Sequence, residues 1–151
     1  MQRRFRFIAI LCLLLPLSFI AGCVTPLPPS AAEIEAKRFE TVPGKAVVYL
    51  FRDKVNYGVV AAPIALDGVQ VGSSFGGTFF RFVLEPGRHR IEGMYVDNGA
   101  IEFTVAADQL YFLQQTVQAT RYVALSGSTF NTADAATGRA RVAQYELTGF
   151  F

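Results

Sequence analysis

The segment Ala46-Val47-Val48-Tyr49-Leu50-Phe51 decides the fold of this chain, because every position in it is apolar or aromatic. A strand with one face in water alternates apolar and polar residues, whereas this segment offers no polar face to the solvent. We therefore expect a central strand that is covered on both faces.

Similar short segments follow this strand and are separated by turn residues. Asp67-Gly68 is the best hairpin signal of the chain, because both positions of a two-residue turn need a positive φ. The further strands are expected over residues 63–66, 69–71, 78–84, 89–95, 100–105 and 109–117. Short strands at this spacing indicate an all-β fold, either a sandwich or a small barrel.

Two short helices flank the predicted strands. Ser30-Ala31-Ala32-Glu33 matches a capping box, which predicts a helix over residues 31–38. Near the other end, residues 120–129 fit either a strand or a loop. Thr132 is then placed to cap a C-terminal helix over residues 133–143.

The N-terminus has the organisation of an export signal. Arginines at positions 3, 4 and 6 precede an apolar run over residues 7–21. A run of about 15 residues is shorter than the roughly 20 that a membrane-spanning helix needs. We therefore expect residues 1–22 to be a cleaved signal peptide.

The signal ends in a sequence that resembles the bacterial lipobox, Ile20-Ala21-Gly22-Cys23. The resemblance implies cleavage before Cys23, attachment of two acyl chains to its sulfur, and usually a third acyl chain on its amino group. Several acyl chains give stable membrane residence, where a single chain is marginal. Val24 follows the cysteine, and by resemblance to enterobacterial sorting this points to the periplasmic side of the outer membrane.

The mature chain would consist of an anchor and one domain. Residues 23–41 are expected to hold the lipidated cysteine, a proline-rich tether and the short helix. The β-sandwich domain is expected over residues 42–151. Because this length is close to the commonest domain size, we expect one hydrophobic core.

Charge and cysteine content exclude several partners. Cleavage removes three basic residues, so the formal charge falls from +2 to −1, and nucleic acid is not an expected partner. Cys12 leaves with the signal and Cys23 is acylated, so no thiol remains for a disulfide or a metal. We expect no metal and no cofactor.

Three motifs together resemble a known family. They are Pro43-Gly44-Lys45-Ala46 at the first strand, Leu66-Asp67-Gly68 with Val71-Gly72, and Glu85-Pro86-Gly87-Arg88-His89. The combination resembles bacterial lipoproteins with a domain of unknown function, over about Pro43 to Val117. The motif at residues 85–89 is also similar to PEGA-type sandwich domains. The resemblance implies a small antiparallel β-sandwich of immunoglobulin-like or transthyretin-like build, and it brings no catalytic residues.

The candidate catalytic groups are few. His89 is the sole histidine. It is either a general base or pH switch, or a structural residue that packs at the start of a strand. Ser126 or Ser128 would be the nucleophile of a Ser-His-Asp arrangement, but neither lies in a G-x-S-x-G context. We therefore expect a protein that is not an enzyme.

Phenylalanines at positions 75, 79, 80 and 82 suggest a binding surface. In a strand Phe80 and Phe82 share one face, and Phe79 and Arg81 share the other. If the second face is exposed, Phe79 and Arg81 suit a protein, a saccharide or a lipid headgroup. If a terminal helix covers it, both faces are core. Near the first loop, Tyr49, Arg52 and Tyr57 form a second candidate patch.

Two functional hypotheses follow from these observations. The first is a lipid-anchored, non-catalytic interaction module that faces the periplasm and binds an envelope protein or cell-wall material. The alternative is capture of a small ligand, such as a lipid or a glycan, in a cleft lined by the phenylalanines.

Overall fold

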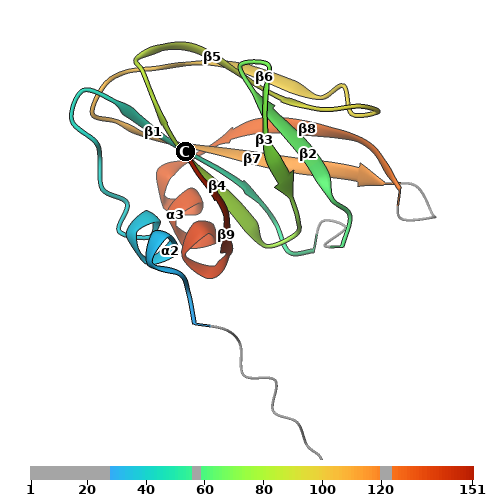
Figure 1. Ribbon diagram of the computed structural model, residues 1–151, viewed down its shortest axis with the longest axis horizontal. Helices are drawn as coiled ribbons and strands as arrows, with labels where there is room; N and C mark the ends of the chain where they lie inside the picture. Colours follow the sequence, from blue (N-terminus) through green and yellow to red (C-terminus); the bar gives the residue numbers. More distant parts are fainter. Residues whose placement is uncertain (1–27, 56–58, 120–123) are drawn as a thin grey trace, which may run out of the picture.

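The computed structural model describes residues 28–55, 59–119 and 124–151, and its strands form two sheets packed face to face (Figure 1). The elements in chain order are α2 (Ala31–Ala36), β1 (Ala46–Arg52), β2 (Ala62–Leu66), β3 (Val69–Ser74), β4 (Thr78–Leu84), β5 (Gly87–Gly93), β6 (Ala100–Val105), β7 (Leu110–Ala119), β8 (Leu125–Ala133), α3 (Ala135–Gln144) and β9 (Glu146–Phe150). One sheet has the order β8-β7-β1-β4-β9, and the other has the order β3-β2-β5-β6. The predicted all-β sandwich is confirmed.

Strand β1 is the middle strand of the five-stranded sheet. All seven of its residues are buried. It pairs antiparallel with β4, where Leu50 faces Phe80, and parallel with β7, where Leu50 faces Leu113. The expectation from its uninterrupted apolar sequence, a central strand covered on both faces, is therefore confirmed.

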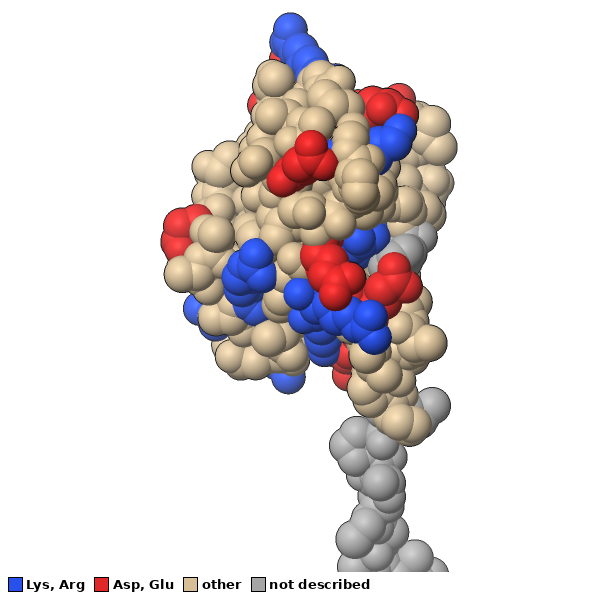
Figure 2. Space-filling model, turned by 90° about the vertical axis from the view of Figure 1, so that its left-hand side faces the viewer, with Lys and Arg blue, Asp and Glu red and all other residues tan. Residues whose placement is uncertain are grey.

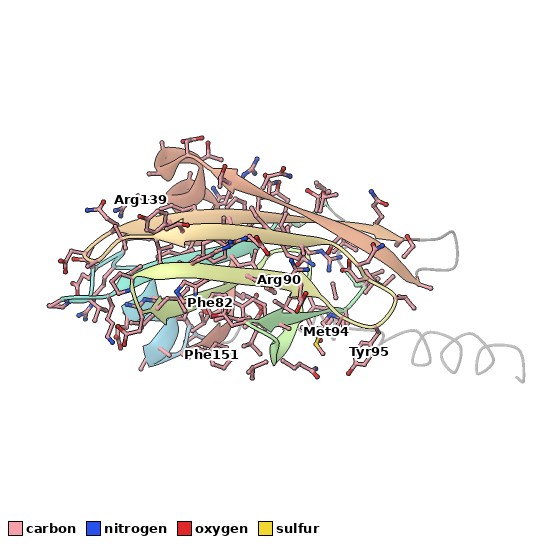
Figure 3. The ribbon with its side chains drawn as sticks, turned by 90° about the horizontal axis from the view of Figure 1, so that it is seen from above. Phe82, Arg90, Met94, Tyr95, Arg139 and Phe151 are labelled. Atoms are coloured by element: carbon pink, nitrogen blue, oxygen red, sulfur yellow. The ribbon has the colours of Figure 1, made fainter. Side chains whose placement is uncertain are left out.

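The inner face of this sheet packs against the four-stranded sheet. Alternate residues of β1 and β4 point into this core, among them Leu50, Phe80 and Phe82, and they meet Ile64 and Ile91 of the other sheet. The rings of Phe80 and Phe82 stack with their centroids 5.7 Å apart. Phe82 also stacks on Phe151 near the end of the chain, at 5.8 Å (Figure 3).

The outer face of the five-stranded sheet is covered by the two helices. Tyr49, Phe79 and Phe112 on the sheet meet Ala36 of α2 and Val142 of α3 in a second buried cluster. Rings of Tyr49 and Phe112 stack at 5.2 Å. This helical layer is the reason that residues of both parities along β1 are apolar.

The helix boundaries follow from their caps. Ser30 accepts a hydrogen bond from the Glu33 N–H at 3.1 Å, so the predicted N-terminal helix and its cap are confirmed, although α2 ends at Ala36. The predicted cap of the C-terminal helix is wrong. Asp134, and not Thr132, accepts from the Thr137 N–H at 2.9 Å, because strand β8 continues to Ala133.

The expectation of a wholly antiparallel sandwich is wrong in the five-stranded sheet, where β1 and β7 are parallel and β4 and β9 are parallel. The chain ends β8 at one edge, returns along α3, and enters β9 at the other edge. A helical crossover of this kind produces parallel strands, whereas a tight hairpin produces antiparallel ones. Strand β9 itself was not predicted.

Charges on the surface are mixed. On the face turned to the viewer in Figure 2, basic and acidic side chains lie next to one another. Arg90–Glu92, at 2.8 Å, is an exposed ion pair, whereas Lys37–Glu33, at 2.6 Å, is partly buried. Exposed pairs of this type contribute at most about 1 kcal/mol each, so they add little to the stability of the fold.

Candidate interaction sites

The predicted Phe79–Arg81 surface does not exist in the folded domain. Phe79 is 0% exposed and Arg81 is 5% exposed, because the helices cover this face. The Tyr49 hydroxyl donates a hydrogen bond to the Ala36 carbonyl at 2.7 Å, and the Arg81 guanidinium lies beside it. Burial raises the pKa of Tyr49, against the opposing effect of Arg81. The proposed exposure is wrong, and the alternative of a covered face is right.

The second predicted patch is also not as expected. Arg52 is fully buried, and its Nη1 donates to the carbonyls of Val60 at 2.7 Å and Ser74 at 3.2 Å. Burial lowers the pKa of Arg52 to about 10. Arg52 therefore fixes two loop ends instead of facing a partner. Tyr49, another member of the patch, is also fully buried, and Tyr57 lies outside the described residues.

His89 is held in a polar bridge between two turns. Its Nδ1 lies 2.7 Å from an Asp67 carboxylate oxygen, and its Nε2 donates to the Glu85 carbonyl at 2.9 Å. The other Asp67 oxygen accepts from the Arg90 N–H at 2.8 Å. Because both ring nitrogens face oxygens, the protonated imidazolium satisfies both contacts.

The titration of this pair follows from its geometry. Partial burial by itself would lower the pKa of His89, but the hydrogen bond and charge of Asp67 and the Glu85 carbonyl outweigh it and raise that pKa. Partial burial likewise opposes ionisation of Asp67, yet the contacts with His89 and Arg90 lower the pKa of Asp67. The pair therefore favours its charged form and ties the Asp67-Gly68 hairpin to β5.

Ser128 belongs to a different buried network. Its hydroxyl donates to Asp97 Oδ2 at 2.5 Å, and its N–H donates to Asp97 Oδ1 at 2.7 Å. The same Oδ1 accepts from the Gly99 N–H at 2.9 Å. Asp97 is only 3% exposed, so this carboxylate joins the β5–β6 loop to strand β8 of the opposite sheet.

The candidate Ser-His-Asp arrangement does not assemble from these contacts. Ser128 is bonded to Asp97, whereas His89 is bonded to Asp67 and Glu85. Ser126 is exposed on β8. The role of the Asp97 carboxylate depends on strand β8, which the fold places next to the β5–β6 loop.

The described surface has a hollow next to each of two edge strands, β6 and β9. One, of about 380 Å³, lies between the edge strand β6 and strands β7 and β8, and its aromatic wall is formed by Phe103, Tyr111 and Phe112. The other, of about 630 Å³, lies between the start of α2 and the start of β9. The phenylalanines of the 75–82 segment line neither of them. Phe79, Phe80 and Phe82 are buried and Phe75 is exposed, so the predicted cleft lined by these phenylalanines is not supported.

The described residues contain neither a membrane-spanning helix nor a metal-binding cluster. Their helices do not reach the length and apolar character that crossing a bilayer requires. Within the same residues, no three His, Cys, Asp or Glu side chains gather where they would hold a metal ion. Cys23 and the residues of the lipobox, Ile20, Ala21 and Gly22, lie outside the described part of the chain, so lipidation stays a prediction.

The fold and its internally bonded polar groups define a small two-sheet β-sandwich domain with helices over one sheet. Within that class, the chain belongs to the family described as protein of unknown function (DUF2846), whose model matches residues 43–128. The match runs from the approach to β1 into β8 and so includes most of both sheets. A comparison with curated proteins gives no match. The predicted membership of a family whose domain has no known function is therefore confirmed.

Proposed function

We propose that this protein is a lipid-anchored lipoprotein of the bacterial cell envelope whose β-sandwich faces the periplasm and serves as a non-catalytic binding module. The observation that carries the proposal is the sequence Ile20-Ala21-Gly22-Cys23 after a basic start and an apolar run of signal-peptide length. Val24 after the cysteine favours the outer membrane.

The length of the tether supports an anchored domain. Cys23 and the cap residue Ser30 are seven residues apart, and a chain reaches at most about 3.5 Å per residue. The folded domain would therefore lie within about 25 Å of its anchor. Such a position suits an envelope protein or cell-wall material as the partner.

The polar groups of the domain support binding and not turnover. His89 and Ser128, the groups of the sequence with the clearest catalytic chemistry, are both engaged in bridges within the fold. A catalytic base and nucleophile need to lie within hydrogen-bond reach of each other. His89 contacts the carboxylate of Asp67, whereas Ser128 contacts that of Asp97, so these contacts do not pair the two residues as base and nucleophile.

Metabolic labelling with an alkyne analogue of palmitate tests the anchor. The wild type and a Cys12→Ala control should carry the label and fractionate with membranes, whereas Cys23→Ala should carry no label. Chemical crosslinking in intact cells should then join the lipidated protein to one recurrent envelope protein or to cell-wall material. A labelled protein that gives neither product would contradict the binding role.

Small-ligand capture is a second candidate, favoured by the hollow beside β6. Its volume of about 380 Å³ is within the usual range for ligand sites, and Phe103, Tyr111 and Phe112 give it an aromatic wall. Thr132→Trp should fill it and abolish binding of a dansylated fatty acid. Asn131→Trp, on the other face of β8, should leave binding intact. If neither this probe nor a cell-wall oligosaccharide binds the wild type, the candidate is excluded.

A further inference from the structure

Two neighbouring loops expose apolar side chains at one end of the sandwich. Val55 and Val59, in the loop between β1 and β2, are 96% and 82% exposed, and Phe75, after β3, is 39% exposed. Figure 1 shows the ends of β1 and β3 on the lower side of the domain. Large apolar side chains that gather on a surface mark contact with a partner or a membrane.

The two loops are fixed to each other. The Gly77 N–H donates to the Arg52 carbonyl at 2.8 Å, so the β3–β4 turn is bonded to the end of β1. The side chain of Lys54 lies over the same turn, since a Cβ atom at Gly77 would be only 2.5 Å from Lys54 Cγ. The turn that follows Phe75 and the end of β1 that precedes Lys54 and Val55 therefore lie together at one end of the domain.

The chain enters the domain next to this end. The Glu146 N–H at the start of β9 donates to the Gly77 carbonyl at 3.0 Å. Glu146 also lines the hollow that Pro28 and Pro29 line, so the first described residues lie near the start of β9. In Figure 1 the chain leaves α2 toward the lower side, the side on which the two loops lie.

The separation between anchor and domain is short. Cys23 and Pro28 are five residues apart, and at about 3.5 Å per residue the chain between them spans no more than about 18 Å. If Cys23 is acylated, the side of the domain that carries Pro28 is held close to the membrane surface. The exposed apolar loops are on that side.

We propose that Val55, Val59 and Phe75 insert into the surface of the membrane that holds the lipid anchor, with Lys54 directed to the phosphate headgroups. This inference rests on the proposed function. It makes the loops a second membrane contact, which would fix the orientation of the domain and direct the β6 edge away from the anchor.

A lipid surface fits these residues better than a protein partner does. The two valines stand almost wholly exposed on a loop and would need a matching cavity in a protein, whereas acyl chains adapt to any apolar side chain. A phenylalanine and a lysine next to them suit the interface, where aromatic rings and long cationic side chains accumulate. The carboxylate that precedes Lys54 in the chain, Asp53, is engaged with the Tyr145 hydroxyl at 2.6 Å and with Arg141.

The absence of tryptophan from the sequence provides a direct test. Phe75→Trp and Val59→Trp each place a single tryptophan in the loops. Val69→Trp is the matched control, because Val69 is 67% exposed but lies at the β2–β3 hairpin, at the opposite end of its strand. Each lipidated mature protein is reconstituted into phosphatidylethanolamine–phosphatidylglycerol vesicles with and without brominated acyl chains.

We expect brominated lipid to reduce the fluorescence of the two loop tryptophans at least twofold, with no change for Val69→Trp. If brominated lipid leaves the fluorescence of each of the three variants unchanged while the protein floats with the vesicles, the insertion is overturned and the anchor is left intact. A protein that does not float with the vesicles would overturn the anchor, and the insertion with it. Circular dichroism of each variant verifies the fold.

Discussion

Replacing Asp97 by alanine should destabilise this domain far more than a change at a neighbouring loop residue. The Asp97 carboxylate accepts from the Ser128 N–H, the Ser128 hydroxyl and the Gly99 N–H, and it is almost wholly buried. These bonds connect the β5–β6 loop to a strand of the other sheet. Alanine leaves three donors without their acceptor.

The magnitude follows from the number and type of these bonds. A hydrogen bond to a charged acceptor contributes about 1.5–3 kcal/mol, and contributions within one network are not additive. We therefore expect Asp97→Ala to lower the free energy of unfolding by about 3–5 kcal/mol. Asp97→Asn should cost less, because its carbonyl oxygen still accepts from both N–H groups and its amide can donate to the Ser128 hydroxyl.

Urea unfolding followed by circular dichroism measures the difference. Asn98→Ala, at the exposed neighbour of Asp97, is the control and should stay within about 0.5 kcal/mol of the wild type. The expected order of stability is wild type and Asn98→Ala, then Asp97→Asn, then Asp97→Ala. If Asp97→Ala matches Asn98→Ala, the carboxylate does not join the sheets and the reasoning fails.

Three further predictions concern single contacts. Gly138→Ala should destabilise the domain by about 1–2 kcal/mol in urea unfolding, because a Cβ at this position would lie 2.2 Å from Phe112. The clash should outweigh the better helix propensity of alanine, and a stabilised variant would contradict this packing. The stability that protonated His89 contributes should be complete below its ordinary pKa of 6.5 and should be lost as the pH rises through its raised pKa. The stability that ionised Asp67 contributes should be complete above its ordinary pKa of 3.8 and should be lost as the pH falls through its lowered pKa. His89→Gln should remove the upper loss from a series of urea midpoints, and an unchanged series would refute the bridge. Tyr49→Phe should cost about 1–2 kcal/mol and increase amide exchange in α2, because it deletes the hydroxyl that binds that helix; unchanged exchange would count against this contact.

The strands that local pattern determines could be predicted from the sequence. The apolar run Ala46 to Phe51 indicated the buried central strand β1, and Asp67-Gly68 placed the hairpin, with positive φ at both residues. Strand β9 and the parallel pairing could not be predicted. Phe79 pairs with Leu147 far along the chain, and no local pattern carries that information.

The candidate site shows the same division. Periodicity correctly placed Phe79 and Arg81 on one face of β4, but it does not say what covers a face, and here two helices do. Asp97 and Ser128 are 31 positions apart, so their bond was invisible in the sequence. The residues that the sequence marked as candidate sites are therefore structural. The exposed valines of the β1–β2 loop could not be recognised as a surface from the sequence, because they belong to no periodic pattern or motif.

Mass spectrometry of the mature protein purified from membranes tests the account most directly. We predict an N-terminal peptide that begins at Cys23 and carries acyl chains on its sulfur and its amino group. A chain that retains residues 1–22, or an unmodified Cys23, would contradict the lipid anchor and the envelope function built on it.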